Sequence, residues 1–82
     1  MIKVLFFGQL KDQLQTGVLE LQSDAPQTVS QLLVNIIEGR PEWSHDLSND
    51  KLLVAVNQVM AKSDTLVPVA AEVAFFPPVT GG

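Results

Sequence analysis

One apolar stripe in the first half of the chain constrains the fold more than any other feature. Its members follow the spacing i, i+3, i+4, i+7 and i+8, and they are Val29, Leu32, Leu33, Ile36 and Ile37. This period places all of them on one face of an α-helix. A helix with one apolar face must bury that face, and the short apolar runs elsewhere in the chain favour a β-sheet as its partner.

Local signals predict where this helix begins and ends. Thr28 and Gln31 form a T-x-x-Q capping box, in which each side chain bonds the backbone N–H of the other residue. Gly39 suits the left-handed residue that closes many helices, and Pro41 prevents the helix from continuing. We therefore predict a helix that follows Thr28 and closes at Gly39, and a loop over residues 41–50.

Short apolar segments on both sides of the helix predict the strands of the sheet. The expected strands cover residues 2–7, 18–21, 52–56, 59–61 and 72–76. The dipeptide Asn57-Gln58 predicts a hairpin turn, and the spacing of Leu10 and Leu14 predicts a short helical turn. Because the first and last strands are the most apolar, we place them side by side in the middle of the sheet.

Together these elements predict an α+β domain over residues 1–76, followed by an extended segment at residues 77–82. The domain is expected to contain a mixed sheet of four to five strands with one main amphipathic helix packed on one face. Such a domain has two layers, and the second face of its sheet stays open.

Alternation along the first and last strands predicts which aromatic side chains reach that open face. Successive side chains of a strand point to opposite faces, so Phe6 and Phe75 are expected to face the helix. Phe7 and Phe76 then lie on the open face with Leu5, beside the C-terminal segment. An exposed apolar patch of this kind usually marks a contact surface, and we interpret it as one.

Composition excludes several classes of function. The 82 residues carry a net charge of −4, which disfavours nucleic acid because nucleic-acid binding requires a basic face. The chain has no cysteine and one histidine, His45, so neither a disulfide nor a metal site is expected. No apolar run approaches the length of a membrane span and the N-terminus lacks a signal-peptide pattern, so we expect a cytoplasmic protein.

No group of residues has the pattern of a self-contained active site. The acidic residues are scattered, and Ser44, His45 and Asp46 are neighbours in sequence, whereas the members of a catalytic triad come from separate segments. We expect His45 to lie on the surface and Trp43 to cover the core beside the end of the helix. The residues therefore favour a carrier or docking module over an enzyme that acts alone.

The C-terminal segment has an unusual composition. Pro77 and Pro78 each fix φ and lack an N–H, so they end the last strand and keep the following residues extended. Gly81 and Gly82 then form a slender tip that can enter a channel too narrow for a side chain. If the chain ends at Gly82, the tip presents a carboxylate.

Three segments resemble a known family, the small subunits of molybdopterin synthase (the MoaD sulfur carriers). They are residues 1–9 (MIKVLFFGQ), 52–58 (LLVAVNQ) and, most specifically, 72–82 (EVAFFPPVTGG). The family has the ubiquitin-like β-grasp fold, which agrees with the predicted order of the strands. The resemblance runs from end to end, although the middle of the chain is generic.

The resemblance implies a function for the C-terminal segment. A ubiquitin-activating-like enzyme would use ATP to adenylate Gly82, and a sulfur donor protein would convert the adenylate to a thiocarboxylate. Val79, Thr80 and Gly81 would enter a pocket of the large catalytic subunit, where the sulfur passes to cyclic pyranopterin monophosphate to build the molybdopterin dithiolene.

The resemblance also implies how the subunits divide the work in a heterotetrameric synthase. Phe7, Met60 and Phe76 match the apolar contact surface of the family. The large subunit would supply the catalytic acids and bases, so this chain would be a non-catalytic, sulfur-carrying subunit of a sulfurtransferase complex with no bound cofactor.

Three alternatives stay open from the sequence. A sulfur carrier of the thiamine pathway shares the Gly-Gly end, but it usually lacks the Phe-Phe-Pro-Pro segment found here. A ubiquitin-like modifier would join Gly82 to a lysine of a target protein. A non-covalent binding domain would use only its surface, and its C-terminal segment would be inert.

Overall fold

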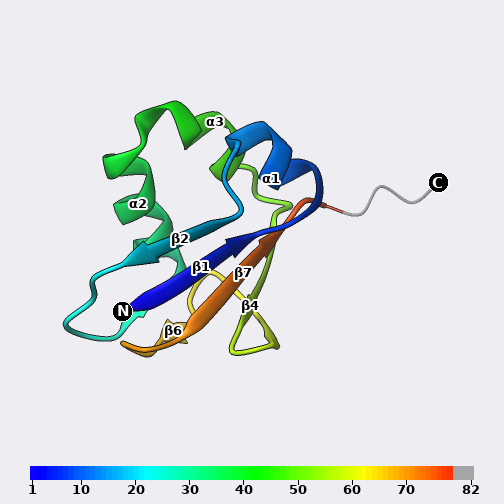
Figure 1. Cartoon of the computed structure of the whole chain (residues 1–82). Coiled ribbons are helices and arrows are strands. Elements are labelled where there is room, and N and C mark those ends of the chain that lie inside the picture. The colour runs from blue at the N-terminus through cyan, green and yellow to red at the C-terminus, as the bar shows by residue number, and fades with distance from the viewer. Residues whose placement is uncertain (79–82) are drawn as a thin grey trace.

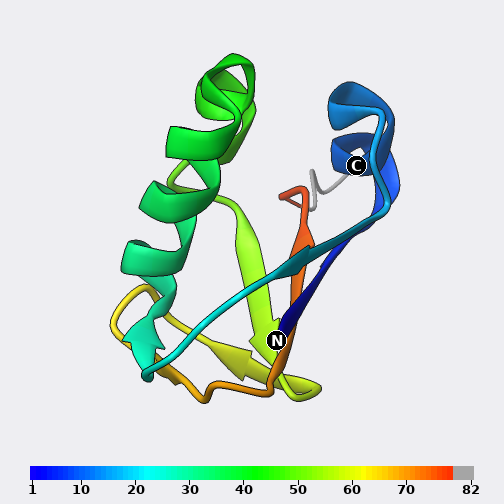
Figure 2. The ribbon, with the colours of Figure 1, turned by 60° about the vertical axis from the view of Figure 1, so that its left-hand side comes forward.

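A mixed β-sheet forms one layer of the molecule, and helix α2 packs across one face of this sheet (Figure 1). The structure is a computed structural model and describes residues 1–78. Figure 2 shows the two layers from the side, with α2 separated from the strands. In chain order the elements are β1 (Ile2–Phe6), α1 (Gly8–Leu14), β2 (Val18–Leu21), β3 (Gln27–Thr28), α2 (Val29–Gly39), the 3-10 helix η1 (Pro41–Trp43), α3 (Ser44–Leu47), β4 (Leu53–Val56), β5 (Val59–Ala61), β6 (Leu66–Val67) and β7 (Glu72–Phe76).

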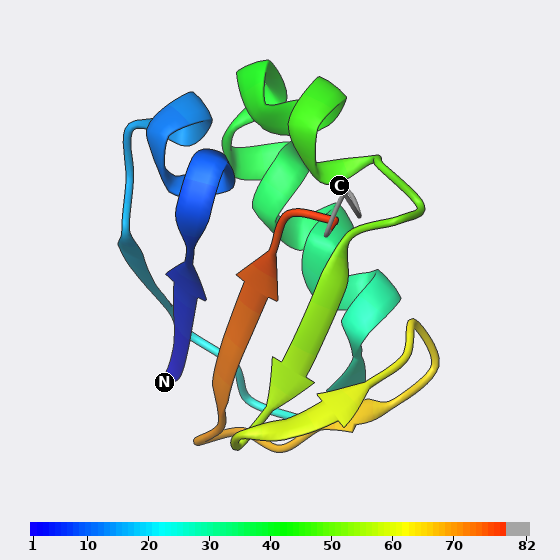
Figure 3. The same cartoon turned by 90° about the vertical axis from the view of Figure 1, so that its right-hand side faces the viewer.

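The main sheet has five strands in the order β2-β1-β7-β4-β5. β1 and β7 are parallel neighbours, with Val4 opposite Val73 and Phe6 opposite Phe75, and the other pairs are antiparallel. The prediction that the first and last strands lie side by side is confirmed. Because parallel strands end at the same edge of a sheet, the residues that follow β1 and β7 lie close together. Figure 3 shows this sheet with α2 behind it.

The core lies between α2 and the sheet, as the alternation of side chains predicted. Phe6 and Phe75 are both buried, and their rings stack with centroids 6.1 Å apart. Trp43 packs edge-on against Phe6 at 5.5 Å, and the guanidinium of Arg40 lies 4.9 Å from the centre of the Trp43 ring. Trp43 therefore covers the core beside the end of α2, as expected, and the cation above its ring adds a favourable contact.

The predicted beginning and end of α2 are confirmed, whereas the left-handed conformation expected for Gly39 is wrong. Thr28 Oγ1 accepts from the Gln31 N–H at 3.1 Å, and Gln31 Oε1 accepts from the Thr28 N–H at 2.9 Å. Gly39 is the last helical residue and does not have a positive φ. The next residue, Arg40, has φ −138° and lies outside the helix, because the proline that follows it disfavours the helical region.

The segment between α2 and β4 is wrongly predicted as a loop, because it contains η1 and α3. Trp43 and Leu47 lie four residues apart and are both buried, so the packing of one helical face against the core stabilises these short helices. None of the helices in residues 1–78 combines the length and the apolarity needed to cross a membrane.

Smaller differences lie at the ends of other elements. β1 ends at Phe6 and β4 begins at Leu53, one residue inside the predicted bounds. The expected helical turn is the full helix α1, with Leu10 and Leu14 buried. The two-residue strands β3 and β6, which pair in a second small sheet, are not apparent from the sequence.

Truncation of the buried face of α2 is expected to destabilise the domain. Ile36 is 2% exposed, so Ile36→Ala should lower the free energy of unfolding by about 2–5 kcal/mol, as other core truncations do. Val34→Ala is the matched control, because Val34 lies on the same helix and is 54% exposed. This control should change stability by about 0.5 kcal/mol or less. Equal losses in urea denaturation would contradict the packing of α2 on the sheet.

Candidate functional site

The open face of the sheet carries a groove beside the end of β7. The residues that line it come from β1, β4, β5 and β7 and from the segments next to them. They are Leu5, Phe7, Ala55, Gln58, Met60, Glu72, Ala74 and Phe76, and they enclose about 360 Å³. They include all four residues that the sequence analysis assigned to protein contact: Leu5, Phe7, Met60 and Phe76. We call Leu5, Phe7, Met60 and Phe76 the contact surface.

An aromatic pair dominates the contact surface. The rings of Phe7 and Phe76 stack nearly parallel, at 10°, with centroids 5.0 Å apart. Phe7 lies just beyond β1 and precedes α1, but its backbone is still extended and its N–H donates to the Phe75 carbonyl at 3.1 Å. This bond holds the Phe7 ring against Phe76 although the ring is 42% exposed. Met60, at 62% exposed, completes the surface from β5.

The chain leaves the contact surface through the elbow, which consists of Pro77 and Pro78. Gly8 lies against it with φ +59°, a conformation that favours glycine. A Cβ on Gly8 would lie 3.2 Å from Pro77 Cγ, so the missing side chain allows the close approach. Pro77 and Pro78 also line a groove together with Leu10, Leu52 and several polar residues. Val79, Thr80, Gly81 and Gly82, which the sequence assigned to sulfur transfer, lie outside the described residues.

The open face is charged at the end away from the elbow. Lys3 on β1 lies opposite Glu20 on β2 and opposite Glu72 on β7. Within residues 1–78 the closest ion pair is elsewhere, between Arg40 and Glu42 at 3.8 Å. Because Glu72 also lines the groove, a partner of the contact surface would meet a carboxylate at its border.

Sequence reasoning missed both polar residues of the groove, Glu72 and Gln58. Alternation along β7 places Glu72 on the same face as Ala74 and Phe76, so the period of the strand could have found it. No comparable signal existed for Gln58, because its position depends on the conformation of the turn between β4 and β5.

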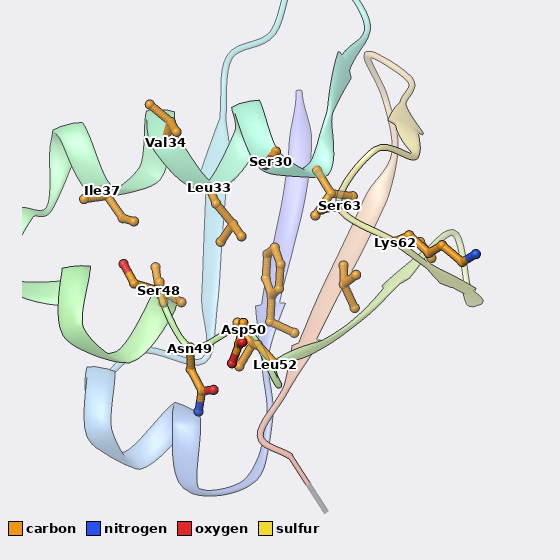
Figure 4. A pocket seen from close by; sticks show the side chains of 15 residues that line it. Ser30, Leu33, Val34, Ile37, Ser48, Asn49, Asp50, Leu52, Lys62 and Ser63 are labelled. Atoms are coloured by element: carbon orange, nitrogen blue, oxygen red, sulfur yellow. The ribbon is translucent and has the colours of Figure 1, made fainter.

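A second groove lies on the helix side of the sheet (Figure 4). It encloses about 450 Å³ between α2, the segment after α3 and the end of β5, and Leu33, Ile37 and Leu52 contribute apolar walls. Asp50 and Lys62 also line it. This groove holds no set of groups suited to catalysis, and within residues 1–78 no three His, Cys, Asp or Glu side chains could hold a metal ion. His45 is exposed, as predicted, and is not part of it.

Comparison with known proteins identifies the family of this chain. The ThiS family is matched over residues 4–82. The chain belongs to the ThiS family. One curated relative is the molybdopterin synthase sulfur carrier subunit of Escherichia coli (strain K12). It is 44% identical to this chain over 82 residues, which are 100% of both chains. The protein of the same name from Haemophilus influenzae is 35% identical over the same share of both chains.

A solved structure has the same fold. The structure of SAMP1 from Haloferax volcanii superposes with a TM-score of 0.80 at 23% identity, and the match covers 99% of this chain and 98% of that one. At this identity the likeness concerns the fold alone. The ThiS family member therefore has the ubiquitin-like β-grasp fold, with α2 held against a mixed five-stranded sheet.

Proposed function

We propose that this chain is the sulfur carrier subunit of molybdopterin synthase. The observation that carries the proposal is the 44% identity, over the full length of both chains, to the Escherichia coli subunit of that name. The geometry supports it, because the exposed contact surface lies directly beside the elbow from which the C-terminal segment continues. Nothing else in residues 1–78 resembles an active site, which suits a carrier.

The chemistry of the proposal takes place on Gly82. A carboxylate is a poor electrophile, so a ubiquitin-activating-like partner uses ATP to convert it to an acyl adenylate with a good leaving group. Sulfide-level sulfur from a donor protein then forms a C–S bond to the acyl carbon, AMP leaves, and the product is a thiocarboxylate. This thiocarboxylate is the activated nucleophile, and it donates its sulfur to cyclic pyranopterin monophosphate.

The contact surface recruits the large catalytic subunit, which supplies the catalytic acids and bases. Phe7, Met60 and Phe76 bury apolar area against this partner, since exposed aromatic residues commonly dominate such interfaces. Val79, Thr80 and Gly81 enter the pocket of the large subunit and carry Gly82 to the substrate. The proposal requires no cofactor bound to this chain and places the reaction in the cytoplasm.

Intact-protein mass spectrometry of the chain isolated from cells tests the proposal. A carrier is expected to show a fraction whose mass has increased by the difference between sulfur and oxygen. A thiol-alkylating reagent should label the thiocarboxylate of this fraction alone, because the chain has no cysteine that could react instead. Cells without the activating enzyme provide the control and should lack the fraction. A ladder of larger lysine conjugates with no sulfur-bearing form would instead favour a protein modifier.

A further inference from the structure

The turn between β4 and β5 has an unusual residue at its second position. Asn57 and Gln58 have φ of +50° and +68°, so both are left-handed. A two-residue hairpin turn of this type requires positive φ at both positions and usually has glycine at the second. A glutamine there is strained, because its Cβ crowds the backbone in the left-handed conformation.

The neighbouring Asn57 has a structural explanation. Its Oδ1 accepts from the Glu72 N–H at 2.9 Å, and its own N–H donates to the Glu72 carbonyl at 2.7 Å. Asparagine also tolerates the left-handed region better than most residues. The Gln58 side chain, in contrast, makes no hydrogen bond to any residue between 1 and 78. No contact of this kind within the described domain offsets the strain at Gln58.

Gln58 lies where a partner would reach it. It is exposed and lines the groove on the open face together with Phe7, Met60 and Phe76. Its carboxamide can donate one hydrogen bond and accept another at the same time. A charged side chain of a partner would pair with only the donor or only the acceptor. A peptide group presents a matching N–H and C=O.

We propose that Gln58 determines the specificity of the contact surface, and that its carboxamide hydrogen-bonds an exposed peptide group of the large subunit. This inference rests on the proposed function, because it names a contact within the complex of the two subunits. Backbone strain is typical of functional sites, where the position of a side chain matters more than local stability. The left-handed turn holds the Gln58 amide at the border of the apolar groove.

Gln58→Gly separates stability from binding. Glycine adopts the left-handed turn without strain, so the free variant should melt several degrees higher than the wild type. The same variant lacks the carboxamide, so its Kd for the large subunit should rise roughly three- to tenfold, the effect of losing a neutral hydrogen bond. Thermal melts of the free chain and calorimetry with the purified large subunit measure the two effects.

The chain contains a matched control in Gln15, a second exposed glutamine with positive φ, at +54°, which ends α1 and does not line the groove. Gln15→Gly should raise the melting temperature in the same way and leave Kd unchanged. Gln58→Glu keeps the shape and the strain but loses the donor, so it should weaken binding with little change in melting temperature.

The outcomes distinguish this inference from the proposed function. If the wild type does not bind the large subunit, the proposed function fails, and the inference fails with it. If the wild type binds and Gln58→Gly binds equally well, the role of Gln58 is wrong while the proposed function stands. A Gln58→Gly variant that melts below the wild type would overturn the strain on which the inference depends.

Discussion

Removal of Gly82 is expected to abolish sulfur transfer and leave the domain folded. The proposed chemistry requires a carboxylate at the tip of the C-terminal segment, and the truncated chain presents it one residue too early. Extended chain advances by about 3.3–3.6 Å per residue, so the carboxylate would stop short of the reacting atoms by that distance. A misplacement of even 1 Å can cost about 100-fold in rate.

Restoration of molybdenum-cofactor synthesis in a strain that lacks the carrier measures this effect. A chain with one residue appended after Gly82 is a second test, because it keeps every native residue but moves the carboxylate in the opposite direction. Both variants should fail to restore synthesis and should melt like the wild type, since the buried core lies within residues 1–76. A truncated chain that still supports synthesis would exclude the carrier function.

Phe76→Arg is expected to leave the free domain folded and to weaken binding of the large subunit at least tenfold. Phe76 stacks on the exposed Phe7 ring on the open face of the sheet, where water can solvate an arginine. In the complex the same charge would be buried without a partner, which is costly. Loss of about 1.4 kcal/mol of binding free energy already gives the tenfold change, and aromatic residues of interfaces often contribute more.

Calorimetry with the purified large subunit, together with a thermal melt, tests this expectation. Val34→Arg is the matched control, because it places the same charge on an exposed apolar residue of α2, on the other side of the molecule. Its affinity should equal that of the wild type. If Phe76→Arg binds normally, Phe76 is not in the interface. If it fails to fold, Phe76 belongs to the core and the faces of β7 are assigned wrongly.

Patterns among neighbouring residues in the sequence determined much of the secondary structure of this protein and which faces of its elements are buried. The stripe on α2, the capping box of Thr28 and Gln31, and the alternation that separates Phe75 from Phe76 all depend on neighbours within a few residues. Such patterns act the same way in any compact fold, because they follow from the periods of the helix and the strand. Three members of the contact surface, Leu5, Phe7 and Phe76, were therefore predictable as open-face residues.

Interactions between distant segments decided the rest. Residues 41–47 form short helices because Trp43 and Leu47 pack on the core, which the sequence does not display. The pairing of β3 with β6 brings together segments nearly forty residues apart. Local propensity is weak for such short elements, so tertiary contacts override it.

The candidate site shows the same division between sequence and tertiary structure. The sequence by itself determined the composition of the C-terminal segment, the two prolines of the elbow and the open-face position of Phe76. Only the tertiary structure decided that Gly8 packs against Pro77 and that Gln58 lines the groove beside Phe7. The physical reason is that the pairings of β1 with β7 and of β7 with β4 bring together residues that are far apart in the chain.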